Sequence, residues 1–503
     1  MTFPSDASDD ALSTVRRTEA GAAVAFARTV RADFDDAIVL ADGSAVAADA
    51  FSAIFAQVEG YPRLHVLDTI DPASVRALEA DIDIARTLFV VSASTDTAFE
   101  PQALFRYFFE RVGAAIGVLA APSRFVAVTT PRTRIELEAR IIGFRHVFVA
   151  GPGNGRRDAL SWFGIVPAAL AGYDIAEIVE RAAHVDSAAA VRLGTRLGAL
   201  ARAGRDKLTI VAHPRVAGLG AWIGNVIAGS TGKGGVGIVP IVGEPLGRAA
   251  VYGPDRAFVF VGDGLPDAPP AFATVLDELA AAGHPVLRLA MRDALDIGAQ
   301  LALWQIAATA AAAALGVDTL ERPDVRESVE IARHVLATSV GGFDIPRVAL
   351  MTPRVAVTKL SGSGALDLGP TLASALGALL RSVTAGDYVA IDAFLPMFDA
   401  HVRTLTSVRR VLRDALAIAT TIGCGPRLPN GLVILLTANP TVALHVPGSV
   451  RFDSLERAQA LGDFIALDRR GRRGLRIHLH GDVATGLRDL ATAVDEAVSS
   501  YAG

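Results

Sequence analysis

Residues 87–113 read "TLFVVSASTDTAFEPQALFRYFFERVG", and this stretch decides the fold. Its segment 88–94 is a short apolar run typical of a buried strand, whereas 100–115 has helical periodicity. Similar apolar runs flank it at 37–41, 64–68, 125–130 and 146–151, and helical patterns at 45–57 and 72–81 separate the earlier ones. Strands that alternate with helices predict a parallel sheet covered by helices on both faces.

The same alternation restarts after two helices predicted near 174–182 and 187–204. The later strand candidates form two further series: 208–213, 237–242, 257–262 and 286–291, then 388–394, 432–438, 464–469 and 475–481. We therefore predict an α/β chain with two doubly wound parallel-sheet units and a C-terminal α/β extension. The expected boundaries are an N-terminal arm 1–30, a first unit 31–185, a second unit 186–345, and a C-terminal region 346–503 that packs on the second unit. Ligands of such sheets bind beyond the carboxyl ends of the strands.

Composition narrows the function classes. The chain has 503 residues, a net charge of −5 and a single cysteine. An acidic balance argues against a nucleic-acid partner, and one cysteine allows no internal disulfide, which suits a reducing, cytoplasmic setting. The N-terminus is polar and acidic, unlike a signal peptide. The longest apolar run, near 307–315, is too short to span a bilayer, so we expect a buried helix and no membrane association.

The stretch "AGSTGKGG" at 228–235 looks like a phosphate-binding loop. A nucleotide-binding P-loop follows a strand, precedes a helix and ends in Gly-Lys-Ser/Thr. Here 221–228 reads as a helix, a strand follows, and Gly234 comes directly after Lys233. The order is reversed, so we predict a glycine-rich helix end that leads into a strand.

Several segments nevertheless resemble one family. "GSTGKGGVGIVPIVGEPLG" (229–247) is similar to the Glu-Ser-Thr-Gly-Lys segment of bacterial phosphoglucose isomerases, especially the short form fused behind transaldolase. Other matching segments follow in the same order: 60–83, 87–113, 154–172, 284–328, 420–427 and 458–483. The resemblance implies two sugar isomerase (SIS) domains, a homodimer, and a cytoplasmic role in glycolysis and gluconeogenesis.

The family's reaction interconverts an aldose and a ketose phosphate. It needs a carboxylate to move a proton between C1 and C2, and a cation for the charge that develops on oxygen. The resemblance implies that Arg156 is the retained cation and that Ser230, Thr231 and Lys233 are retained ligand-binding residues. Gly229 stands where the family has its catalytic Glu. About ten family residues after 425–427, including a late catalytic Lys, are absent.

The family's phosphate loop corresponds to 92–98. Its Lys is replaced by Ser94 and one Gly by Asp96, while Ser92, Thr95 and Thr97 keep hydroxyl groups. The neighbouring glycine loop is 40–45, which here contains Asp42 and Ser44. A carboxylate about 4 Å from a phosphate costs on the order of several kcal/mol at intermediate dielectric, so we expect a neutral or cationic ligand to suit this loop better.

Other polar residues leave alternatives open. Asp42 and Asp96 are either a carboxylate pair that binds a cation or amine, or two solvated loop acids. Lys233 is either a cation in a cleft or an ordinary loop residue. His478 and His480 alternate on one strand and point to the same face, but without a nearby acidic or cysteine partner we predict no metal site and no cofactor.

Two functions follow. The first is a degenerate phosphoglucose-isomerase homologue, without catalysis, that binds a sugar or sugar phosphate. It would serve as a scaffold or regulator, as a homodimer or with a glycolytic or pentose-phosphate enzyme such as transaldolase. The alternative is an active aldose–ketose isomerase, for glucose 6-phosphate or another sugar, in which a different acid replaces the missing Glu.

Overall fold

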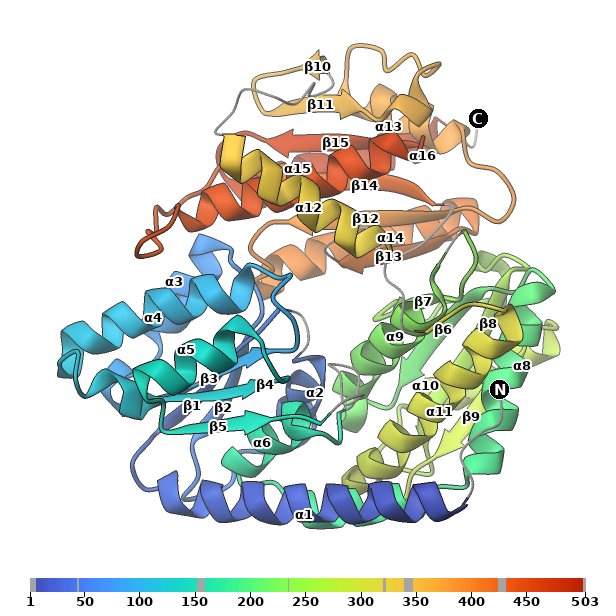
Figure 1. Cartoon of the computed structure of the whole chain (residues 1–503). Helices are drawn as coiled ribbons and strands as arrows, with labels where there is room; N and C mark the ends of the chain where they lie inside the picture. Colours follow the sequence, from blue (N-terminus) through green and yellow to red (C-terminus); the bar gives the residue numbers. More distant parts are fainter. Residues whose placement is uncertain are drawn as a thin grey trace.

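The computed structural model describes residues 6–42, 45–151, 159–233, 235–319, 323–338, 347–423 and 431–500. Three β-sheets, each built from a consecutive part of the chain, are surrounded by helices (Figure 1). The mixed α/β class with parallel sheets is confirmed.

The first sheet has five parallel strands in the order β2-β1-β3-β4-β5. They are β1 (Asp36–Leu40), β2 (Arg63–Leu67), β3 (Thr87–Ala93), β4 (Phe125–Thr129) and β5 (His146–Val149). Alternate side chains pack on opposite faces, where helices cover both sides. One face holds α3 (Pro72–Ala80), α4 (Glu100–Ile116) and α5 (Arg134–Ile142); the other holds α1 (Asp6–Val30), α2 (Val46–Ile54) and α6 (Trp162–Leu170).

The second sheet has four parallel strands in the order β7-β6-β8-β9. They are β6 (Lys207–Ala212), β7 (Val239–Val242), β8 (Arg256–Asp263) and β9 (Val286–Ala290), each close to its predicted position. The helices are α7 (Ile175–Ala183), α8 (Ser187–Arg202), α9 (Ala217–Thr231), α10 (Pro270–Ala281) and α11 (Ile297–Leu315). One apolar core runs through the first and second sheets by way of α1, α2, α9 and α11.

Helix α11 contains the apolar run at 307–315. Together with the short turn before it, it forms a segment, 294–315, that is the single stretch in the described residues long and apolar enough to cross a membrane. Its window is 61% buried inside the protein. The helix packs against α8, α7 and α9, so it is the buried helix that the sequence predicts.

The third sheet has six strands in the order β10-β11-β15-β14-β12-β13, of which β10 and β11 form an antiparallel edge. They are β10 (Val348–Met351), β11 (Val355–Lys359), β12 (Tyr388–Phe394), β13 (Ala419–Gly423), β14 (Leu432–Ala438) and β15 (Gly474–Leu479). Helices α13 (Leu372–Arg381), α14 (Asp399–Leu416) and α16 (Val483–Ser499) cover one face; α15 (Phe452–Arg469) covers the other, with α12 (Pro323–Thr338) packed on α15 (Figure 1).

The strand predicted at 464–469 is wrong, because these residues are the end of α15. Most of α15 is buried on all sides, so its apolar residues show no helical stripe. A short apolar run of this kind has the same pattern in a buried strand and in a buried helix.

The C-terminal sheet contacts both preceding units. Toward the second sheet, Lys207 Nζ donates to the carbonyl oxygen of Gly386 at 2.6 Å, and the fully buried Arg256 pairs with Glu244 at 3.0 Å beside β13. Toward the first, the rings of Tyr107 and Phe452 lie 5.4 Å apart, so this region also covers α4.

Candidate functional site

The carboxyl edge of the first sheet brings two of the predicted loops together. Strand β1 is bonded to β2 on one side and to β3 on the other, so the chain changes direction there, which is the position at which open α/β sheets bind ligands. Leu40 pairs with Val91, which places Asp42 and Ser94 at the same edge. Ser44 lies outside the described residues.

The loop 94–99 after β3 carries most of the predicted hydroxyl groups. Ser92 and Ser94 are buried, and Ser94 Oγ has no hydrogen-bond partner among the described residues. Thr95 and Thr97 are exposed, with their Oγ1 atoms 2.6 Å apart. Thr130 Oγ1 donates to the Ser94 carbonyl at 2.9 Å and holds the loop against the next strand.

Asp96 turns its carboxylate toward a helix. Its Oδ1 accepts a hydrogen bond from the backbone N–H of Arg134, the first residue of α5, at 2.9 Å. A helix N-terminus carries a partial positive charge, which offsets part of the carboxylate's charge. The expected repulsion of a phosphate at this loop is weakened, because the negative charge is already engaged.

Two side chains from distant parts of the chain reach this loop and its helix. Arg333 of α12 donates from Nη2 to the carbonyl oxygens of Asp96 at 2.6 Å and Thr97 at 3.1 Å. Gln459 of α15 donates to Glu100, the first residue of α4, at 2.6 Å. Neither contact is visible in the sequence, because the partners are separated by more than 230 residues.

Carboxyl groups with raised pKa values lie near the same edge. Burial raises the pKa of Asp49, in the first turn of α2, to about 7, and the carboxylate of Asp68 beyond β2 adds to the rise. Burial also raises the pKa of Glu456 in α15 to about 8, with Asp71 and Asp453 contributing. A carboxyl group that titrates near neutrality can both accept and donate a proton, which is typical of functional sites.

The Gly-Ser-Thr-Gly-Lys segment has a different surrounding. Helix α9 runs back from the carboxyl end of β6 to the start of β7, so its end lies at the amino edge of the second sheet. Thr231 Oγ1 donates to the Ile227 carbonyl at 2.8 Å and accepts from the Ile238 N–H at 3.0 Å. Lys233 Nζ bonds to the Asp318 carbonyl, and the side chains of Ser230, Thr231 and Lys233 are buried. The helix–loop–strand order is confirmed.

Several predicted positions fall outside the described residues or on other elements of the fold. Arg156 and the segment 424–427 lie outside the described residues, and Gly229 lies in the last turn of α9. His478 bonds to Thr437 and Asn439, and burial lowers its pKa to about 4. No group of three metal-ligating side chains occurs in the described part of the chain.

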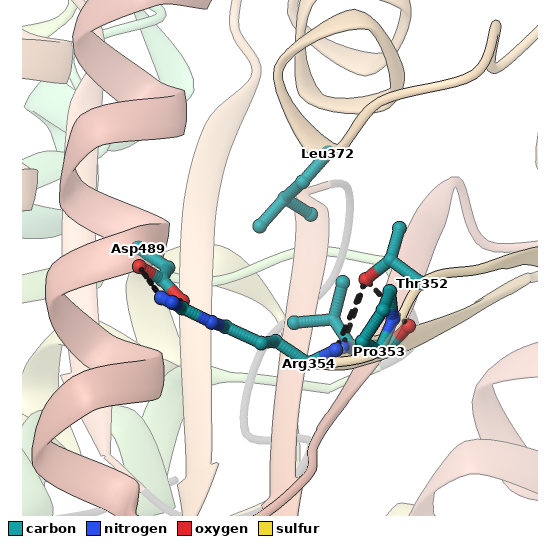
Figure 2. Close-up of a pocket in the computed structure, with 6 residues that line it drawn as sticks. Thr352, Pro353, Arg354, Leu372 and Asp489 are labelled. Atoms are coloured by element: carbon teal, nitrogen blue, oxygen red, sulfur yellow. Dashed lines mark hydrogen bonds and ion pairs between the residues drawn. The ribbon is translucent and has the colours of Figure 1, made fainter.

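Two surface cavities lie elsewhere. One, of about 300 Å³, is formed by the β10–β11 turn and α13, where Arg354 extends to Asp489 on α16 (Figure 2). The other, of about 730 Å³, lies at the amino edge of the first sheet between Arg31, Tyr61 and Arg63. Neither is lined by a residue of the predicted site.

Sequence relatives support the predicted family. The chain is 26% identical over 192 residues to a probable glucose-6-phosphate isomerase of Methanococcus maripaludis, a match that covers 36% of this chain and 43% of the relative. It is 28% identical over 160 residues to a glucose-6-phosphate isomerase of Parabacteroides distasonis, covering 29% and 36%. The matched segments thus span less than half of these relatives. No protein-family model matches the chain.

Solved structures establish the fold. A glucose-6-phosphate isomerase of Chlamydia trachomatis aligns with a TM-score of 0.53 at 18% identity, over 68% of this chain and 77% of that one. A hypothetical protein of Thermus thermophilus aligns with a TM-score of 0.55 at 20% identity, over 64% and 88%. The chain is therefore similar in sequence to glucose-6-phosphate isomerases and has the sugar isomerase (SIS) fold of the phosphosugar isomerases.

Proposed function

We propose that this protein binds a phosphorylated sugar at the carboxyl edge of its first sheet and does not isomerise it. The observation that carries the proposal is the loop 94–99, which lies at the change of strand direction between β1 and β3. It presents the hydroxyls of Thr95 and Thr97 to solvent and has the guanidinium of Arg333 beside it.

The electrostatics of this loop favour an anion. The Asp96 carboxylate is bonded to the start of α5, whereas Arg333 is exposed and makes no ion pair within the described residues. A phosphate needs hydroxyl and N–H donors together with a nearby cation, and all three are present here. We therefore expect a phosphorylated ligand at this loop, and not the neutral or cationic ligand expected from the sequence.

We propose the absence of catalysis because Gly229 stands where the resemblance places the family's catalytic Glu. Glycine has no group that transfers protons, and a missing general base removes on the order of 10²–10⁴ in rate. A protein that binds the sugar phosphate without converting it would act as a regulatory or scaffold partner of another enzyme of carbohydrate metabolism.

A second function, an active isomerase, is favoured by one observation. Burial raises the pKa of Asp49 to about 7, and Asp49 lies in the helix that follows the loop after β1. An enediol mechanism needs a group that accepts a proton from one carbon and returns it to the next. A carboxyl group half-protonated at neutral pH meets that requirement.

One experiment separates the two functions. The purified full chain is titrated with 6-phosphogluconate by calorimetry, and conversion of fructose 6-phosphate is measured in parallel. Binding without turnover is expected. Turnover at about 1–10³ s⁻¹ that is abolished in Asp49→Asn establishes the isomerase instead. A chain that neither binds nor converts the sugar phosphate contradicts both.

A further inference from the structure

The contact between Arg333 and the loop after β3 is built from two rigid parts. Helix α12 is fixed on α15, where Ser328 Oγ donates to the Asp463 carboxylate and Arg470 pairs with Glu327 at 2.7 Å. The helices approach closely at Gly462, where a Cβ would lie 2.5 Å from the Ser328 carbonyl oxygen. Arg333 therefore projects from an anchored helix.

The first unit holds the other side of the contact. Phe452, at the start of α15, belongs to the same apolar core as α3 and α4. The Arg333 guanidinium also lies 5.7 Å from the centre of the Phe99 ring, in cation–π range. The loop 94–99 is consequently clamped between its own sheet and α12.

The contact with Arg333 fixes the direction in which two backbone N–H groups of the loop 94–99 point. One nitrogen of Arg333 binds the carbonyl oxygens of both Asp96 and Thr97. In a trans peptide the N–H points opposite to the carbonyl, and the described chain has no cis bond. The N–H groups of Thr97 and Ala98 therefore point away from α12. The Thr97 N–H donates a long hydrogen bond, 3.4 Å from N to Oγ1, to the Thr95 hydroxyl, so it points toward the hydroxyl side of the loop.

We propose that Arg333 is the positioning residue of an anion cradle formed by the N–H groups of Thr97 and Ala98 and the hydroxyls of Thr95 and Thr97. Successive N–H groups aimed at one point form an anion-binding concavity. Arg333 orients these donors through their carbonyls and adds a positive charge at the loop. The inference rests on the proposed function, since the anion is the phosphate group of the sugar.

The test measures anion affinity in the full chain. Inorganic phosphate and 6-phosphogluconate are titrated into the wild type, Arg333→Ala and Arg333→Lys by calorimetry at several salt concentrations. We expect Arg333→Ala to weaken both affinities about tenfold or more and to reduce their salt dependence. Arg333→Lys restores part of the affinity, because the ammonium keeps the charge and one donor. Arg354→Ala, which removes an exposed arginine from the distant β10–β11 turn, leaves both affinities unchanged and serves as the matched control.

The outcomes distinguish the two proposals. A wild type that binds 6-phosphogluconate, together with an equally tight Arg333→Ala, overturns the role of Arg333 and leaves the proposed function standing. A wild type that binds neither ligand overturns both. A loss in Arg333→Ala that Arg333→Lys does not recover, accompanied by a lower melting temperature, assigns Arg333 a structural role and also overturns the inference.

Discussion

Two loops of this chain are rich in glycine or hydroxyl residues, and the fold uses them differently. The loop 94–99 follows a parallel strand, so the hydroxyls of Thr95 and Thr97 lie at the carboxyl edge of the first sheet and are exposed. The segment 229–233 lies at the end of a helix, where Ser230, Thr231 and Lys233 are buried and the Thr231 hydroxyl and the Lys233 amine bond to backbone carbonyls. The position of a loop relative to its strand decides whether its polar groups meet a ligand or hold the chain together.

The largest effect is expected at Asp49, in the first turn of α2, the helix that follows the loop after β1. Because burial raises its folded pKa to about 7 from 3.8, the folded state holds a proton that the unfolded state has lost between about pH 4 and pH 7. Stability therefore falls as pH rises through this range. Asp49→Asn removes the dependence and is more stable than the wild type at pH 8 by roughly 1–4 kcal/mol.

Urea unfolding at pH 5 and pH 8 measures this difference. At pH 5 the gap in stability between the wild type and Asp49→Asn is expected to be smaller than at pH 8, because the unfolded carboxyl group is already ionised at pH 5 while the folded one is still neutral. If the stability difference between the wild type and Asp49→Asn is the same at pH 8 as at pH 5, the Asp49 carboxyl group is solvated. Asp49 is then not the proton-transfer group of the alternative isomerase.

The next effect belongs to the buried segment. Thr231→Val removes the donor to Ile227 and leaves the Ile238 N–H without its acceptor. An unsatisfied buried group of this kind costs about 1–3 kcal/mol. We expect a lower free energy of unfolding with unchanged affinity for 6-phosphogluconate, measured by urea denaturation and calorimetry. A loss of affinity at unchanged stability would return this segment to the ligand site.

The smallest effect on stability is expected from the same Thr→Val substitution in the loop 94–99. Thr97→Val removes an exposed hydroxyl whose described side-chain partner is Thr95. We expect stability within about 0.5 kcal/mol of the wild type and an affinity for 6-phosphogluconate weakened by about tenfold, or ~1.4 kcal/mol. Because Thr97→Val and Thr231→Val make the same chemical change, any difference between them reports the position of the hydroxyl in the fold. An identical response of both variants breaks the contrast between the loops.

Local patterns in the sequence determined the strands of the first and second sheets. A buried parallel strand such as β3 is a continuous apolar run, and the polar loop after it is visible without a structure. The rule that ligands meet the carboxyl ends of parallel strands then places 40–45 and 92–98 at one edge. The short strands β10, β11 and β13 and the buried helix α15 were not predicted, because their apolar residues carry no distinctive period.

Only the tertiary structure decided which charges act at the loop. The resemblance implies that Asp96 stands where the family has a glycine, but the direction of its carboxylate depends on α5. Arg333 lies 237 residues further along the chain and reaches the loop because α12 packs on α15 and α15 packs on the first unit. The raised pKa of Asp49 likewise depends on burial. Side-chain direction and desolvation arise from packing between distant segments, which no local pattern records.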